Sequence, residues 1–87
     1  MIKAFMLYAM QFASQHTGYP IQEMPIVIIA NNPSITCQIE GAYACQYVNY
    51  IVMPKHCDIE LSLECKGALI HEMTHYLQFK AQAVLSC

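Results

Sequence analysis

The sequence predicts a single small α+β domain, in which a three-stranded mixed sheet is accompanied by an N-terminal helix and a C-terminal helix. The chain has 87 residues, the length of one domain. Apolar residues recur at helical spacing near both ends, whereas short runs rich in β-branched and aromatic residues occupy the middle. The chain has no linker, repeat or low-complexity segment, so residues 1–87 are expected to form one compact unit.

The first element is predicted to be a helix over residues 2–16. Its apolar positions follow 3, 4 and 7 spacing, typical of a helix that lies on a sheet, and they are Ile2, Phe5, Met6, Ala9, Met10, Phe12 and Ala13. Gly18 ends the helix, and Pro20 prevents it from resuming.

The second element is predicted to be a strand over residues 26–30. Pro25 introduces this β-branched run, which is typical of a strand covered on both faces. Residues 34–40 fit either a short helical turn or an irregular strand, and Gly41 then permits a tight bend. Alternation over residues 42–53 predicts two short antiparallel strands that end at Pro54.

The last element is predicted to be a helix over residues 61–80. This stretch contains no proline, and apolar residues recur along it at helical spacing. Either Asp58 or Ser62 is suited to be the N-cap, because a short side-chain oxygen can accept the unpaired amide hydrogens of the first turn.

The predicted C-terminal helix carries the motif His-Glu-Met-Thr-His at residues 71–75. His71 and His75 are one turn apart, so both imidazoles can reach one metal ion. Glu72 lies about 100° around the helix, close enough to take a proton from water at the open position of the metal. H-E-x-x-H on a helix therefore indicates zinc, with His71 and His75 as ligands and Glu72 as the general base.

A catalytic zinc needs three protein ligands, and the motif supplies two. Other residues with suitable donor atoms are more simply explained as solvated or capping side chains, and they are His16, His56, Cys57, Asp58 and Cys87. Water or a residue outside these 87 fits the third position better.

The composition restricts the partners of the chain. Charged residues make up 11% and apolar residues 56%, compared with about 25% charged in ordinary soluble domains. Apolar surface is therefore expected to be covered by a partner or by further chain. The longest apolar run near the start, residues 4–10, is too short to span a membrane. A net charge of −2 with four basic residues gives no support for nucleic-acid binding.

The five cysteines lie at positions 37, 45, 57, 65 and 87, without a C-x-x-C pair, which argues against a zinc ribbon. Cys57 and Cys65 are eight residues apart, so they could form a disulfide in an oxidising compartment. Because no clear signal peptide is present, the sequence favours a cytoplasmic location with reduced thiols.

Tyrosines and methionines are better explained by packing than by chemistry. A tyrosine hydroxyl could stabilise an oxyanion, and the tyrosines considered are Tyr43, Tyr47, Tyr50 and Tyr76. Strand and helix tyrosines more often bury their rings. The methionines Met6, Met10, Met24 and Met53 are predicted to fill the core.

The order helix, strands, helix with H-E-x-x-H resembles the minimal zincin core. The likeness is closest to small bacterial and phage zincin-like proteins, and it rests on residues 16–20, residues 50–54 and, above all, residues 69–78. The resemblance implies a zinc metallopeptidase in which an edge strand ending near Met53 aligns an extended peptide by backbone hydrogen bonds.

The chain departs from two zincin branches after His75. Metzincins continue with a glycine and a third histidine, where this chain has Gln78 and Ala81. Gluzincins take a glutamate from a later helix, but residues 76–87 contain no Glu, Asp or His. We therefore expect the C-terminal part of the site to be missing, and the chain alone to be a weak or inactive enzyme.

The leading hypothesis is a zinc-dependent peptidase that cleaves a peptide or protein substrate. The alternative is a non-catalytic zincin-like domain that binds metal or a protein partner. A third hypothesis is a disulfide-stapled secreted domain in which the motif is coincidental.

Overall fold

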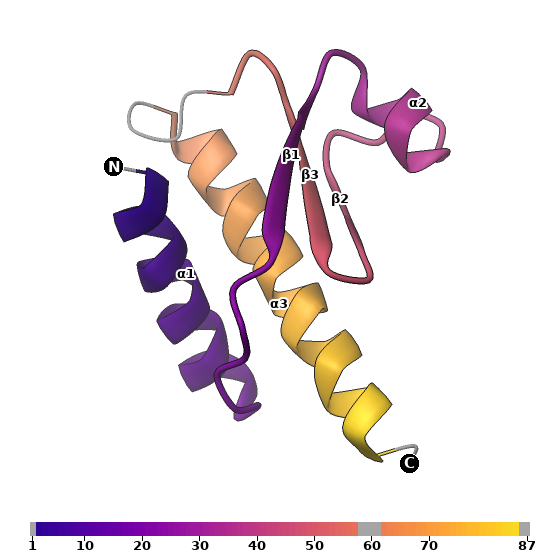
Figure 1. Cartoon of the computed structure of the whole chain (residues 1–87). Coiled ribbons are helices and arrows are strands. Elements are labelled where there is room, and N and C mark those ends of the chain that lie inside the picture. The colour runs from indigo at the N-terminus through magenta and orange to yellow at the C-terminus, as the bar shows by residue number, and fades with distance from the viewer. Residues whose placement is uncertain (1, 58–61, 86–87) are drawn as a thin grey trace.

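The computed structural model describes residues 2–57 and 62–85 as an α+β fold. The elements along the chain are α1 (Ile2–Thr17), β1 (Ile26–Ala30), α2 (Pro33–Cys37), β2 (Cys45–Tyr47), β3 (Tyr50–Pro54) and α3 (Leu63–Leu85) (Figure 1). The predicted fold class, both long helices and all three strands are confirmed. The likeness to the zincin core stays a prediction.

The sheet is mixed, as predicted, with the strand order β1-β3-β2. β1 is parallel to β3, and β2 is antiparallel to β3. The prediction that the strand ending near Met53 is an edge strand is therefore wrong. Met53 lies in β3, the central strand, and its Cα partner is Ile29 of β1. The edge strands are β1 and β2. The sequence does not reveal this order, because the parallel pairing of β1 with β3 joins segments more than twenty residues apart.

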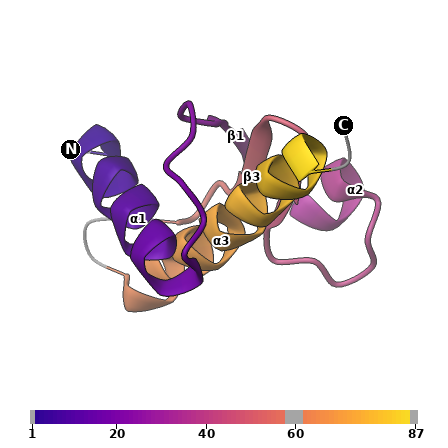
Figure 2. The same ribbon diagram turned by 90° about the horizontal axis from the view of Figure 1, so that it is seen from below.

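The main core lies between α1, α3 and one face of the sheet (Figures 1 and 2). It contains Met6, Ala9, Met10 and Ala13 of α1, Ile51 and Met53 of β3, and Leu69, Met73, Tyr76 and Leu77 of α3. Burying each large apolar side chain contributes about 1.5–3 kcal/mol. The helix with the histidine pair is thus held against both α1 and the sheet. The predicted core role is confirmed for Met6, Met10 and Met53 and is wrong for Met24, which is 36% exposed.

β1 is more exposed than the sequence predicts. Ile26 and Ile29 are each 56% exposed, so the prediction of a strand covered on both faces is wrong. β1 is an edge strand, and α2 packs mainly against β2 and β3. A continuous β-branched run shows that a segment is a strand, but it does not show how many neighbours the strand has.

The ambiguous segment 34–40 contains most of the short helix α2. Asn32 is its N-cap, because the Asn32 side-chain oxygen accepts a hydrogen bond of 3.2 Å from the Ser34 N–H. Pro33 occupies the first helical position, where its missing N–H costs nothing. The helix ends at Gln38, which has a left-handed φ of 59°.

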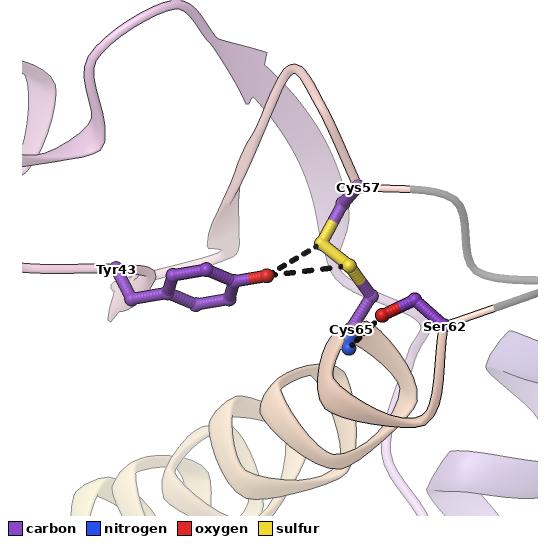
Figure 3. The surroundings of a disulfide bond; sticks show 4 residues. All are labelled: Tyr43, Cys57, Ser62 and Cys65. Carbon is purple, nitrogen blue, oxygen red and sulfur yellow. Dashed lines mark hydrogen bonds between the residues drawn. A yellow bond between two sulfur atoms is a disulfide. The ribbon is translucent and has the colours of Figure 1, made fainter.

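α3 begins after Ser62, one of the two predicted N-caps. The Ser62 hydroxyl oxygen accepts a hydrogen bond of 3.2 Å from the Cys65 N–H (Figure 3). Asp58, the other predicted cap, lies outside the described residues.

Two disulfides join Cys37 to Cys45 and Cys57 to Cys65. The structure therefore differs from the prediction of reduced thiols. It contains the Cys57–Cys65 disulfide, which the sequence indicates as the less favoured alternative. In each pair the cysteines are eight residues apart. The first disulfide connects α2 to the edge strand β2, and the second connects the chain beyond β3 to the first turn of α3.

Candidate metal and catalytic site

His71 and His75 lie on an exposed face of α3 with their rings converging. Their Nε2 atoms are 3.0 Å apart, and the ring centroids are 4.5 Å apart with an interplanar angle of 86°. Both side chains are exposed. The separation of four residues along a regular helix is sufficient to bring the two rings together.

The pair has the geometry of two corners of a zinc site. With zinc–nitrogen bonds of about 2.0–2.1 Å, two ligands at tetrahedral angles lie roughly 3.3 Å apart. The observed 3.0 Å is close to that separation. The same distance also suits a hydrogen bond between a protonated and an unprotonated ring nitrogen, which satisfies the two imidazoles of the metal-free protein. The two imidazoles could therefore hold a zinc ion, and a catalytic site would need one more protein ligand.

Glu72 is the one buried charged residue among those the structure describes, with 8% of its surface exposed. Burial raises the pKa of the Glu72 carboxyl, and positive charge on His71 and His75 acts in the opposite direction. A raised pKa makes the Glu72 carboxylate a stronger base than an ordinary solvated glutamate.

Glu72 and His75 border an open hollow of about 440 Å³ between α3 and β2. One wall comes from Ile39 and residues 44–46, at the edge of the sheet. The other wall continues along α3 through Gln78, Phe79 and Gln82. A peptide segment that enters this hollow would pass beside the second histidine and the buried carboxylate.

The sequence pattern does not identify the walls of this hollow. The α3 side has a signal in retrospect, because Gln78, Phe79 and Gln82 follow His75 at intervals of three, four and seven residues and so share its helical face. No sequence signal identifies the β2 side, because the position of this wall depends on which strand pairs with β3 and on which side of β3 it lies.

The third-ligand candidates that the structure describes do not join the histidine pair. His16 stacks on Phe12 with ring centroids 4.1 Å apart, His56 packs on Tyr43 at 5.8 Å, and Cys57 is bonded to Cys65. Asp58 and Cys87 lie outside the described residues. Within residues 2–57 and 62–85, no group of three or more His, Cys, Asp or Glu side chains could hold a metal ion.

Two of the tyrosines considered as oxyanion donors form hydrogen bonds with other groups, and two line a different hollow. The Tyr43 hydroxyl contacts the sulfurs of Cys57 and Cys65, and the Tyr76 hydroxyl donates to the backbone carbonyl oxygen of Glu23. Tyr47 and Tyr50 line a different hollow, between the sheet and α2. The predicted burial is confirmed for Tyr76, and Tyr43 is partly buried, whereas Tyr47 and Tyr50 are 70% and 39% exposed, so the prediction that their rings are buried is wrong.

Comparisons of the chain with protein-family models, with curated proteins and with solved structures found no match. Among the described helices, none combines the length and the apolar character needed to cross a membrane.

Proposed function

We propose that this chain is a zincin-like, zinc-dependent metallopeptidase, with His71 and His75 as metal ligands and Glu72 as the general base. The observation that carries the proposal is the 3.0 Å approach of the two Nε2 atoms beside a buried carboxyl, at the border of an open hollow. A carboxyl beside the pair can act as a general base and accelerate hydrolysis, whereas a purely structural histidine pair gains nothing from it.

The residues of the chain divide the work as follows. When bound, zinc would polarise the scissile carbonyl and lower the pKa of water at its open position. Glu72 accepts a proton from the attacking water and delivers it to the leaving amine nitrogen, so that its carboxylate is regenerated in each cycle. Burial of Glu72 supports this role, because it raises the pKa of the carboxyl and so makes the carboxylate a stronger base.

The edge strand β2 is the proposed guide for an extended substrate. Among the described strands, β2 pairs with β3 alone, so one of its edges is open to backbone hydrogen bonds. Residues 44–46 also border the hollow that contains Glu72 and His75. β2 therefore takes the role that the resemblance assigned to the strand ending near Met53.

The test is hydrolysis of an unfolded protein substrate with added zinc. Glu72→Gln should retain zinc and lose about 10²–10⁴-fold in turnover, because general acid-base catalysis has that magnitude. Glu64→Gln is the matched control, since Glu64 is an exposed carboxylate in the first turn of the same helix. Equal turnover by wild type and Glu72→Gln would overturn the assignment of the base.

The second candidate function is a non-catalytic metal-binding or protein-interaction domain. It is favoured by the two-ligand set and by an apolar hollow of about 550 Å³ between α1 and β1, bordered by Met6, Leu7, Val27 and Ile29. Zinc binding without any chelator-sensitive cleavage would support this function instead.

The disulfides also bear on location. Disulfides persist in oxidising compartments and are rare in the cytosol. We therefore propose an oxidising environment for the folded protein, in place of the cytoplasmic location favoured by the sequence.

A further inference from the structure

β2 is a short edge strand that lies beside the candidate site. It has three residues, and its register with β3 is Cys45 with Val52, Gln46 with Ile51 and Tyr47 with Tyr50. Short edge strands open readily when pairing with one neighbour is all that holds them. Yet residues 44–46 form a wall of the hollow beside Glu72 and His75. Something besides the sheet is needed to fix this wall.

The first attachment is the Cys37–Cys45 disulfide. It joins the first residue of β2 to the last residue of α2, with the two Cα atoms 6.2 Å apart. Cys45 is buried with Ala30 and Val52 on the face of the sheet opposite the main core, and Cys37 packs against the same cluster. This bond prevents the start of β2 from leaving the sheet.

The second attachment is made by Tyr43, two residues before β2. Its hydroxyl lies 3.2 Å from Sγ of Cys57 and 3.3 Å from Sγ of Cys65 (Figure 3). The two sulfurs are bonded to each other and carry no hydrogen, so the hydroxyl must be the donor. A tyrosine hydroxyl is protonated at neutral pH, and burial, assisted by the charge of Glu64, raises the pKa of Tyr43 further.

The acceptor disulfide is attached to the helix that carries the motif through one of its two cysteines, Cys65. Cys65 is 2% exposed and lies in the first turn of α3, six residues before His71. Its N–H is capped by Ser62. Tyr43 therefore connects the chain entering β2 to the start of α3, and Cys45 connects β2 to α2.

We propose that Tyr43 and the two disulfides form a redox-sensitive clamp that positions β2 beside Glu72 and His75, so that reduction loosens the substrate-binding wall but leaves the histidine pair in place. The consequence for catalysis rests on the proposed function, whereas the structural part does not. The histidine pair survives because its spacing is set within α3, which the main core holds against α1 and β3.

The reduction is a two-electron step for each disulfide. A trialkylphosphine cleaves the S–S bond and becomes a phosphine oxide, with its oxygen taken from water, and each sulfur becomes a thiol. A phosphine is chosen over a dithiol because thiolates bind zinc and would confuse metal loss with clamp opening.

The experiment is backbone hydrogen exchange of residues 45–47 and residues 71–77 in the oxidised and the phosphine-reduced protein. On reduction, exchange at 45–47 should become about tenfold faster or more, while exchange at 71–77 changes less than about twofold. Cys37→Ser/Cys45→Ser should reproduce the effect. Equally slow exchange at 45–47 in both forms, or equal acceleration of both segments, would overturn the clamp.

Tyr43→Phe tests the second attachment without removing a disulfide. It deletes the hydroxyl and keeps the ring, so exchange at 45–47 should become roughly threefold faster or more. Tyr47→Phe is the matched control, because the Tyr47 side chain is 70% exposed. Identical exchange in Tyr43→Phe and wild type would overturn the role of Tyr43.

With a cleavable peptide, Tyr43→Phe should raise KM by about fivefold and change kcat and zinc content little, since a loosened wall weakens substrate binding before it affects the base. Cleavage by no form of the protein would overturn the proposed function, and the exchange data would still decide the clamp.

Discussion

The Nε2 atoms of His71 and His75 lie 3.0 Å apart on α3. This relationship needs nothing but a regular helix, because residues four apart meet on one face. The surroundings of the pair, in contrast, depend on tertiary contacts. The buried Glu72, the hollow beside it and the clamped edge strand arise from contacts between segments distant in the sequence.

A thiol count tests the cysteine pairing. Four of the five cysteines form two disulfides, so the denatured, unreduced protein should show at most one reactive thiol per chain. After reduction the count should be five, the number of cysteines in the sequence. Titration with a chromogenic thiol reagent in denaturant measures both values. Three or more thiols before reduction would contradict the pairing.

Tyr76→Phe tests the link between α3 and the segment that precedes β1. Tyr76 is 1% exposed, and its hydroxyl donates to the carbonyl oxygen of Glu23. Loss of this hydrogen bond should lower the free energy of unfolding by about 1 kcal/mol at pH 7. Chemical denaturation measures the change, and Tyr47→Phe, at an exposed position, should leave the free energy of unfolding unchanged.

The pH dependence of that difference has a definite sign. Burial, with a contribution from Glu23, raises the pKa of Tyr76 above its unfolded value. Tyr76 therefore contributes its full stability below the unfolded pKa of about 10 and loses it as the pH rises through the folded pKa. The stability difference between wild type and Tyr76→Phe should stay constant from about pH 7 to 9 and shrink above about pH 10. A difference that grows in alkali would contradict this assignment.

Gly67→Ala tests whether the glycine inside α3 is required. Gly67 is exposed, and a Cβ added there would meet no heavy atom within 4 Å. Alanine should therefore raise the free energy of unfolding by roughly 0.5–1 kcal/mol, through higher helix propensity. Gly18→Ala should do the reverse, since Gly18 has a φ of +79° at the end of α1. Thermal unfolding of the two variants measures both effects, and a destabilised Gly67→Ala would show that the position is constrained.

The helices could be predicted closely because their signal is local. The stretch predicted over residues 61–80 corresponds to α3 at Leu63–Leu85, and residues 2–16 correspond to α1 at Ile2–Thr17. Apolar periodicity and caps such as Ser62 act within a few turns. α2 was also within reach, since Asn32 followed by Pro33 is a helix-start signal that periodicity alone overlooks.

The sheet could be predicted in its strands but not in its pairing. β3 is central because β1 pairs with it in parallel on the side away from β2. This pairing joins segments that are far apart in the sequence, so no local pattern predicts it. The exposure of Ile26 and Ile29 follows from the same contact, which makes β1 an edge strand. The repeated spacing of eight residues in Cys37–Cys45 and Cys57–Cys65 was a usable hint, although spacing does not decide which sulfurs meet.

The candidate site likewise has a part that the sequence predicts and a part that it does not. His71, Glu72 and His75 could be predicted because one helix contains them. The wall formed by residues 44–46 and the clamp through Tyr43 could not, since both depend on where β2 lies relative to α3.

Zinc content tests the central claim most directly. Wild-type protein at dialysis equilibrium with a known free zinc concentration should bind about one zinc per chain by elemental analysis, with an affinity below that of a four-ligand site. His71→Ala and His75→Ala should each lose nearly all of it, while His56→Ala, which changes a histidine packed on Tyr43, should keep it. No zinc in the wild type, or equal zinc in wild type and both motif variants, would contradict the assignment of His71 and His75 as metal ligands.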